Sequence, residues 1–298
     1  MDQLPSADHG GASPLIDGHC HAWRTWPYAP LVPDPGLRGT VEQLLWEMDQ
    51  SGVQKACLVA ANIEKNLDNN AYVAKCVARH PERLYHFAHI DCHWEPTYQA
   101  DGAAKRLAAL VRRFRPVGVT KYFGSEVTDW PLSQEGTAFF SEAERLGVIL
   151  SLAARPGWQP QLREVARRFT GLSILLHHLG SFRSSNLPAN EAFALIARTL
   201  ENENVYVKLS GFHYGAARAW EFPQKEAIGF ARRIHGITGG SKLCWGSDYP
   251  VIKRDRSFTY QQTIEMVRTH CTFLAPSDIP LVMGGTLSRL LNARRPTS

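Results

Sequence analysis

The stretch KACLVAA, residues 55–61, is a short and continuous apolar run. It is followed by the pattern NNAYVAKCVARHPERL (69–84) and by a second apolar run, LYHFAHID (84–91). A run without polar alternation is typical of a strand that is buried on both faces, as in a parallel sheet. The segment between the runs has helical periodicity, with Pro81 after its expected end. Together they predict a strand, a helix and a second parallel strand.

The same unit recurs along the whole chain. Apolar runs, each followed by a helical pattern, occur at 14–19, 55–61, 84–91, 116–123, 148–154, 172–178, 204–211 and 242–248. The helical patterns fall at 41–52, 69–80, 101–113, 134–146, 159–169, 189–201, 223–235, 259–270 and 284–293. Eight such units predict an α/β protein with a (β/α)8 TIM barrel. A doubly wound open sheet is the alternative, but neither GxGxxG nor GxxxxGK[ST] occurs in the sequence.

The length of 298 residues fits one large domain. No linker, low-complexity tract or internal repeat interrupts the pattern, so we expect a single domain over 14–298. The first thirteen residues, MDQLPSADHGGAS, have neither a basic start nor an apolar stretch. This predicts a flexible leader and not a signal peptide. The sequence leaves the formation of a homo-oligomer open.

Composition limits the partners and the location. No apolar run approaches the ~20 residues that span a bilayer, so we expect no membrane partner. Six cysteines are scattered without a CxxC pair, which predicts a reducing cytoplasm. The net charge of +5 favours an anionic or hydroxylated small molecule, and the lack of a basic run with interleaved aromatics argues against nucleic acid.

The ends of the predicted strands collect polar residues. In a (β/α)8 barrel the chemistry lies at the carboxyl ends of the strands. Candidate groups at these ends are Asp17, His19, His21, His89, Asp91, Lys121, His177, His178, Lys208, Ser210, His213 and Asp248. We therefore expect the functional site among them.

Two short motifs stand out in this set. In DGHCHAW (17–23), His19 and His21 point to the same face of a strand, which is the geometry of a metal-binding pair, although a chance pair in a loop has the same spacing. In GSDYPV (246–251), Asp248 falls where the strand ends, and Pro250 stops the strand. A carboxylate there would serve as a general base for water or as a metal ligand; an ordinary turn aspartate is the alternative.

Several motifs together resemble a known family. DGHCHAW, LDNN (67–70), ARHPERL (78–84), HHLG (177–180), VYVKLSG (205–211) and LCWGSDYPV (243–251) look like the amidohydrolase superfamily, and more narrowly its sugar-lactonase and 2-pyrone-4,6-dicarboxylate lactonase branch. The resemblance extends from about residue 15 to 292. It implies a distorted, amidohydrolase-type barrel, a catabolic role, and a site that contains His19, His21, His178 and Asp248.

The fifth predicted strand departs from the superfamily pattern. Where a histidine commonly completes the metal site, ILSLAARP (149–156) places Ala153, Ala154 or Arg155. The resemblance therefore leaves two cases open: a single zinc or other divalent ion held by His19, His21, His178 and Asp248, or a site that works without metal. Lys121 would be a carboxylated bridging ligand in a binuclear site, or a cation that binds a substrate carboxylate.

We predict a hydrolase that opens a lactone bearing a carboxylate or hydroxyls. Asp248 would activate water, while His178, His19 and His21 polarise the ring carbonyl, directly or through zinc. The residues that would bind the substrate are Lys121, Arg155, His213, Tyr214, Trp23 and His89. The alternatives are a metal-dependent non-oxidative decarboxylase or hydratase of the same superfamily, and a catalytically silent barrel that binds a ligand.

Overall fold

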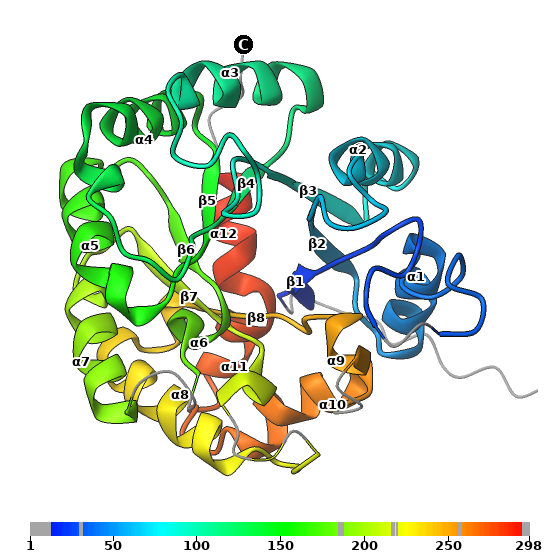
Figure 1. The fold of residues 1–298 in the computed structure, drawn as a ribbon. Helices are drawn as coiled ribbons and strands as arrows, with labels where there is room; N and C mark the ends of the chain where they lie inside the picture. The colour runs from blue at the N-terminus through cyan, green and yellow to red at the C-terminus, as the bar shows by residue number, and fades with distance from the viewer. Residues whose placement is uncertain are drawn as a thin grey trace, which may run out of the picture.

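The protein is described by a computed structural model that covers residues 13–29, 32–183, 188–215, 218, 220–254 and 258–293. The leader predicted for residues 1–13 lies outside this part of the chain, except for Ser13. Eight strands form one parallel sheet in sequence order, surrounded by helices (Figure 1). The predicted (β/α)8 barrel is confirmed.

The strands are short because each needs only a few residues to span the height of the barrel. They are β1 (Ile16–Cys20), β2 (Lys55–Val59), β3 (Leu84–His89), β4 (Gly118–Tyr122), β5 (Ile149–Ala153), β6 (Ile174–Leu176), β7 (Val205–Leu209) and β8 (Leu243–Trp245). The closure between β8 and β1 is irregular. Beyond β8, an isolated parallel bridge joins Cys20 to Tyr249, and His21 N donates to Tyr249 O at 2.6 Å.

Helices follow the strands at the nine predicted positions, and three short ones, α6, α9 and α11, were not predicted. They are α1 (Val41–Gln50), α2 (Asn69–Arg79), α3 (Ala103–Phe114), α4 (Gln134–Leu146), α5 (Gln159–Arg168), α6 (His178–Ser181), α7 (Ala189–Leu200), α8 (Lys225–Thr238), α9 (Val251–Arg254), α10 (Tyr260–Glu265), α11 (Asp278–Pro280) and α12 (Thr286–Asn292). The helix expected over 259–270 begins at a capping box of Thr259 and Gln262 and changes to a π-helical turn at Met266. None of the helices in the described ranges has the length and apolar character that crossing a bilayer requires.

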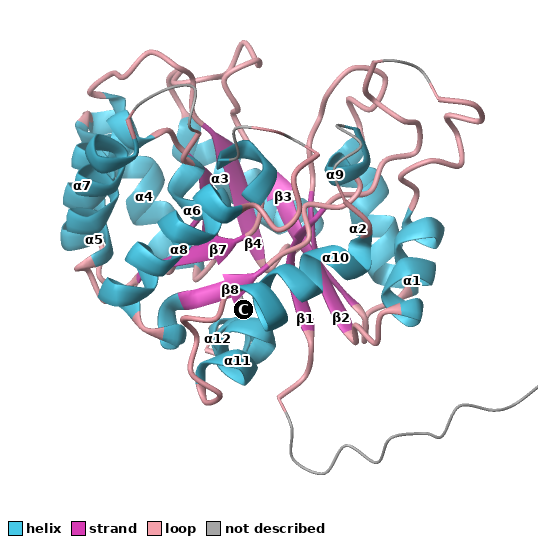
Figure 2. Cartoon of the chain, turned by 90° about the horizontal axis from the view of Figure 1, so that it is seen from below, coloured by secondary structure: helices cyan, strands magenta, loops and turns pink. Residues whose placement is uncertain are grey.

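The amino-terminal half of the barrel interior is apolar. Ile16, Phe87, Ile149 and Leu175 pack there with Leu287, Leu290 and Leu291 of α12. In Figure 2, α12 lies beneath the strands, on the side where β1 begins. Burial of this apolar layer stabilises the fold. It leaves the opposite, carboxyl end of the strands for polar side chains.

Candidate active site

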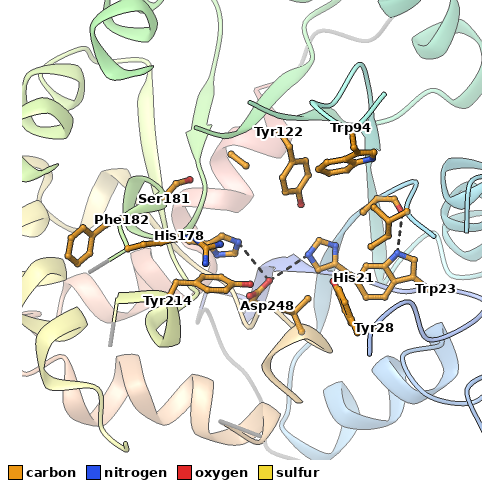
Figure 3. A pocket seen from close by; sticks show the side chains of 15 residues that line it. His21, Trp23, Tyr28, Trp94, Tyr122, His178, Ser181, Phe182, Tyr214 and Asp248 are labelled. Carbon is orange, nitrogen blue, oxygen red and sulfur yellow. Dashed lines mark hydrogen bonds and ion pairs between the residues drawn. The ribbon is translucent and has the colours of Figure 1, made fainter. Parts of the chain in front are cut away.

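A cavity of about 250 Å³ opens at the carboxyl ends of the strands. Its walls are mainly aromatic, and its floor carries His21, His178 and Asp248 (Figure 3). The aromatic side chains are Trp23, Tyr28, Trp94, Tyr122, Phe182 and Tyr214. An apolar pocket with a few converging polar groups is the usual form of a small-molecule site.

Asp248 is the central group of the floor. Its side chain is 1% exposed, and neither carboxylate oxygen has a hydrogen-bond partner among the described residues. Nε2 of His19 and of His21 each lie 3.6 Å from Asp248 Oδ1, Nε2 of His178 lies 3.8 Å from it, and Nε2 of His213 lies 3.7 Å from Oδ2. These gaps are too long for hydrogen bonds. The carboxylate is therefore surrounded by imidazoles but not bonded to them.

The backbone holds Asp248 in an unusual conformation. Its φ is 59°, in the left-handed region that costs energy for a residue other than glycine. The turn is fixed from both sides: Asp248 N donates to His19 O at 2.7 Å, and the buried Asp17 carboxylate accepts from Ser247 N and Oγ at 2.9 and 2.6 Å. Gly246 is needed for this closure, because a Cβ there would lie 2.8 Å from His19 Cβ. Asp17, at the first strand end, thus has a structural role.

The hydrogen bonds of His21 fix its tautomer. His21 Nδ1 lies 2.6 Å from Val59 O, and a carbonyl oxygen can only accept, so the proton is on Nδ1. His21 Nε2 is therefore a lone pair that faces Asp248 and His19. This is the arrangement in which a histidine binds a metal or accepts a proton.

His19 carries its proton on the other ring nitrogen. Lys208 Nζ lies 2.9 Å from His19 Nδ1, so a charged lysine donates to Nδ1 and leaves the proton of the neutral imidazole on Nε2. That Nε2 lies 3.2 Å from His21 Nε2, whose lone pair accepts the hydrogen bond. His19 is thus a hydrogen-bond donor toward the site as long as Lys208 is charged.

Lys208 belongs to a buried polar chain beneath the floor. Its Nζ also donates to Ser151 Oγ at 2.7 Å, and Ser151 Oγ lies 2.6 Å from His177 Nε2. Burial lowers the pKa of Lys208 to about 8, and burial and then Lys208 lower the pKa of His177 far below its usual range. These groups do not line the cavity; they orient the side chains that do.

His178 is presented by a left-handed turn after β6. His178, Leu179, Gly180 and Ser181 all have φ between 43° and 74°, so α6 has no ordinary helical geometry. His178 Nδ1 lies 2.9 Å from Ser210 Oγ, and a Cβ on Gly211 would lie 2.6 Å from that nitrogen. Strain of this kind occurs where a side chain must be held in one position.

The ionisation states follow from burial and neighbouring charges. Burial alone would raise the pKa of Asp248, but the histidines around it, His178 first, lower it to about 2. Burial lowers the pKa of His178 to about 3 and that of His19 well below its usual range. At neutral pH Asp248 is therefore ionised, whereas His178 and His19 are neutral.

Most of the residues predicted from the sequence meet at this floor. His19, His21, His178 and Asp248 come together, and Trp23 stacks on His21 with 5.0 Å between the ring centroids. His213 is buried beside Asp248 without lining the main cavity, whereas Tyr214 does line it.

Three residues predicted to bind the substrate lie elsewhere. Lys121 is fully buried, its Nζ is within hydrogen-bond distance of Asp91 O, and the rings of Tyr98 and Trp130 lie around it. His89 is 2% exposed beneath the wall, and Arg155 is exposed outside the cavity. For Lys121 the cause is the direction of the side chain: a residue near a strand end faces either the lumen or the helix layer, and Lys121 faces the helix layer, where the Trp130 ring lies.

The sequence did not point to Ser181, Phe182 and Arg183, which line the cavity at the end of the left-handed turn and directly after it. The available signal was their position, three to five residues beyond His178 at the same strand end. It was not recognised because the turn has no helix or strand pattern.

The floor can be tested for its fit to a metal ion. Tetrahedral zinc with bonds of ~2.0–2.1 Å needs donor atoms about 3.3 Å apart. His19 Nε2, His21 Nε2 and Asp248 Oδ1 are separated by 3.2, 3.6 and 3.6 Å, so the distances fit. His21 and Asp248 present lone pairs as they stand. His19 can join them only with its proton on Nδ1, which requires Lys208 to be neutral and to accept a hydrogen bond from Nδ1.

The sequence matches a known family, and the fold is similar to those of solved structures. A family model described as amidohydrolase matches residues 16–292. No curated protein matches the sequence significantly. Among solved structures, an amidohydrolase from Burkholderia multivorans with bound zinc has a TM-score of 0.74 at 16% identity, covering 94% of this chain and 99% of that one.

Two further structures show the range of proteins with this fold. A probable 2-pyrone-4,6-dicarboxylic acid hydrolase from Acinetobacter baumannii with citric acid bound has a TM-score of 0.72 at 20% identity, covering 93% and 99% of the two chains. A 2,6-dihydroxybenzoate decarboxylase from Rhizobium has a TM-score of 0.65 at 16% identity, covering 94% and 99%. At these identities the likeness establishes the fold.

Proposed function

The chain belongs to the amidohydrolase family, and we propose that it hydrolyses a lactone that bears a carboxylate or hydroxyls. The observation that carries the proposal is Asp248: an ionised, buried carboxylate with no hydrogen-bond donor among the described residues, at the floor of an open cavity. Burying an ionised carboxylate without a hydrogen bond costs free energy, and groups of this kind are concentrated in functional sites. The similarity in fold to a probable pyrone-dicarboxylate hydrolase supports the same reaction class.

In the proposed reaction, Asp248 takes a proton from a water molecule as the water oxygen attacks the ring carbonyl. The base needs to be ionised, and its pKa of about 2 keeps it so at neutral pH. The ring C–O bond then breaks, and protonated Asp248 returns its proton to the oxygen that leaves the carbonyl carbon. The product is an open hydroxy or oxo acid, whose new carboxyl group releases one proton to solution.

The histidines stabilise the negative charge that develops on the carbonyl oxygen. His19 offers an Nε2 proton because Lys208 occupies its Nδ1. His178 does the same when Ser210 donates its hydroxyl hydrogen to Nδ1. Donors preorganised in a dry site are worth more than in water. If a zinc ion is held by His21, Asp248 and His19, the chemistry it supplies is Lewis-acid polarisation of the same carbonyl.

The test is proton release from a panel of lactones, with aldonolactones beside pyrone and muconolactone acids. Wild type, Asp248→Asn and the exposed control Glu126→Gln are compared, each with zinc and with chelator. We expect release by wild type and Glu126→Gln, and a loss of about 10²–10⁴-fold in Asp248→Asn, the range for a general base. Turnover by Asp248→Asn within a few-fold of wild type would refute the assignment of the base.

A metal-dependent decarboxylase is the rival that the same site supports, because His19, His21 and Asp248 have donor distances suitable for a metal. The decarboxylase of similar fold is the second reason to test it. This function predicts CO2 release from aromatic acids, full loss of activity with chelator, and no proton release from lactones. A catalytically silent barrel predicts ligand binding with neither reaction.

A further inference from the structure

The cavity has one permanent cation on its described lining, Arg183. The side chain is exposed, and within the described ranges no carboxylate forms an ion pair with it. Its guanidinium carbon lies 4.2 Å from the ring centroid of Tyr214. A guanidinium stacked on an aromatic face keeps its N–H groups, which point outward in its own plane, available for a carboxylate.

Arg183 and Asp248 are held apart by Tyr214. The Tyr214 hydroxyl points toward Asp248 in Figure 3, while Arg183 lies over the ring. The segment that carries Arg183 is fixed next to it, because Phe182 stacks on Phe230 with centroids 4.0 Å apart and an interplanar angle of 3°. The cavity lining therefore holds a carboxylate that the Tyr214 hydroxyl faces and a guanidinium that the Tyr214 ring supports.

We infer that Arg183 recognises a single carboxylate on a planar ring, and that this is the substrate class of the site. The inference rests on the proposed function in one respect, that the reacting carbonyl lies at Asp248. Arg183 is the one arginine or lysine on the described lining, so it is the group there that can pair with a carboxylate of the ring. The aromatic walls favour a flat ring, and a volume of about 250 Å³, below the ~300–1,000 Å³ of most ligand sites, admits one ring.

Binding of benzoate, benzamide and isophthalate, measured by isothermal titration calorimetry, tests this inference without turnover. Benzoate has a ring and one carboxylate, benzamide is its uncharged counterpart, and isophthalate carries a second carboxylate. None is a lactone, so their binding reports recognition alone. We expect wild type to bind benzoate about tenfold more tightly than benzamide, as one charge-assisted bidentate contact gives, and isophthalate no more tightly than benzoate.

The variants are Arg183→Gln, Arg183→Lys and the control Arg112→Gln, an exposed arginine of α3 outside the cavity. We expect Arg183→Gln to bind benzoate and benzamide within about twofold of each other, Arg183→Lys to keep part of the preference, and Arg112→Gln to keep all of it. Equal binding of benzoate and benzamide by wild type, or an unchanged preference in Arg183→Gln, would overturn the inference. So would tighter binding of isophthalate.

The same proteins separate this inference from the proposed reaction. A benzoate preference that depends on Arg183, together with no lactone hydrolysis, would leave the recognition role in place and remove the lactonase. Lactone hydrolysis that is indifferent to a carboxylate on the substrate and to Arg183 would do the reverse.

Discussion

Two groups of histidines and acids lie at the same end of the barrel, and only one of them reaches the cavity. The pocket cluster consists of His21, His178 and Asp248, which line the cavity, and the buried His19 beneath them. The third-strand cluster consists of His89, Cys92 and Glu95, whose ligand atoms lie within 4.8 Å of one another, as do those of His19, His21 and Asp248. Both contain residue types that bind metals, so composition does not distinguish them.

The third-strand cluster uses its polar atoms on itself. His89 Nδ1 lies 3.3 Å from Cys92 Sγ, and His89 Nε2 lies 2.9 Å from Glu95 Oε2. Glu95 Oε2 also accepts from Cys92 N at 2.9 Å. An ion bound there would use one atom of each residue and would have to replace these contacts.

The pocket cluster differs in its carboxylate. Neither oxygen of Asp248 has a hydrogen-bond partner among the described residues, although His21 Nε2 accepts from His19 Nε2 at 3.2 Å. The comparison teaches that the two clusters differ in whether the carboxylate is already hydrogen-bonded, which neither sequence spacing nor burial reveals.

The largest expected effect is on catalysis. Asp248→Asn removes the base while keeping the shape of the side chain, and we expect kcat/KM to fall by about 10²–10⁴-fold. Glu95→Gln removes a carboxylate of the other cluster, and we expect kcat/KM to stay within about threefold of wild type. Initial rates on the best lactone measure both. Similar losses in the two variants would erase the distinction between the clusters.

Zinc affinity is the second way to separate the clusters. His21→Gln removes a lone pair that already faces the site, and we expect zinc affinity in equilibrium dialysis to fall by at least about tenfold. His89→Gln should leave it unchanged. A fall in His89→Gln would place the ion in the third-strand cluster. A wild type that takes up no zinc would mean that the pocket histidines act as donors and acceptors alone.

The third effect is on stability. Glu95→Ala leaves Cys92 N and His89 Nε2 without their carboxylate, and we expect the free energy of unfolding to fall by about 1–3 kcal/mol in urea titrations. The control is Glu126→Ala at an exposed position without an ion pair among the described residues, for which a change within about 0.5 kcal/mol is expected. An equal loss in both variants would contradict a structural role for Glu95.

The barrel and the centre of its site could be predicted from the sequence because both depend on local patterns. Eight apolar runs between helical segments define the strands, and parallel strands bring their carboxyl ends together. His19, His21, His178 and Asp248 could therefore be placed in one site although they are separated by up to 229 positions in sequence. The helix expected over 259–270 was interrupted at Met266, since a π-helical turn has no sequence signal of its own.

The walls of the site could not be predicted in the same way. Lys121 and Arg183 are both cations beyond or near a strand end, yet one is buried among aromatic rings and the other lines the cavity. The difference depends on the direction of a side chain and on four successive residues with positive φ from His178 to Ser181. Three of these four are not glycine, so no residue type marks the turn.

The smallest expected effect is that of mild acid. The pKa values of Asp248, about 2, and His178, about 3, lie below their usual ranges, so both groups stay unprotonated as the pH falls from 7.5 to 5. A lowered pKa moves the acidic limb of a rate profile to lower pH, and we expect kcat/KM to change by less than about twofold over this interval. The pH profile of kcat/KM on the best lactone, with circular dichroism at each pH, measures it. A tenfold loss near pH 6.5 in the folded protein would mean that a histidine with an ordinary pKa controls the reaction, and that the pocket cluster is less dry than its burial indicates.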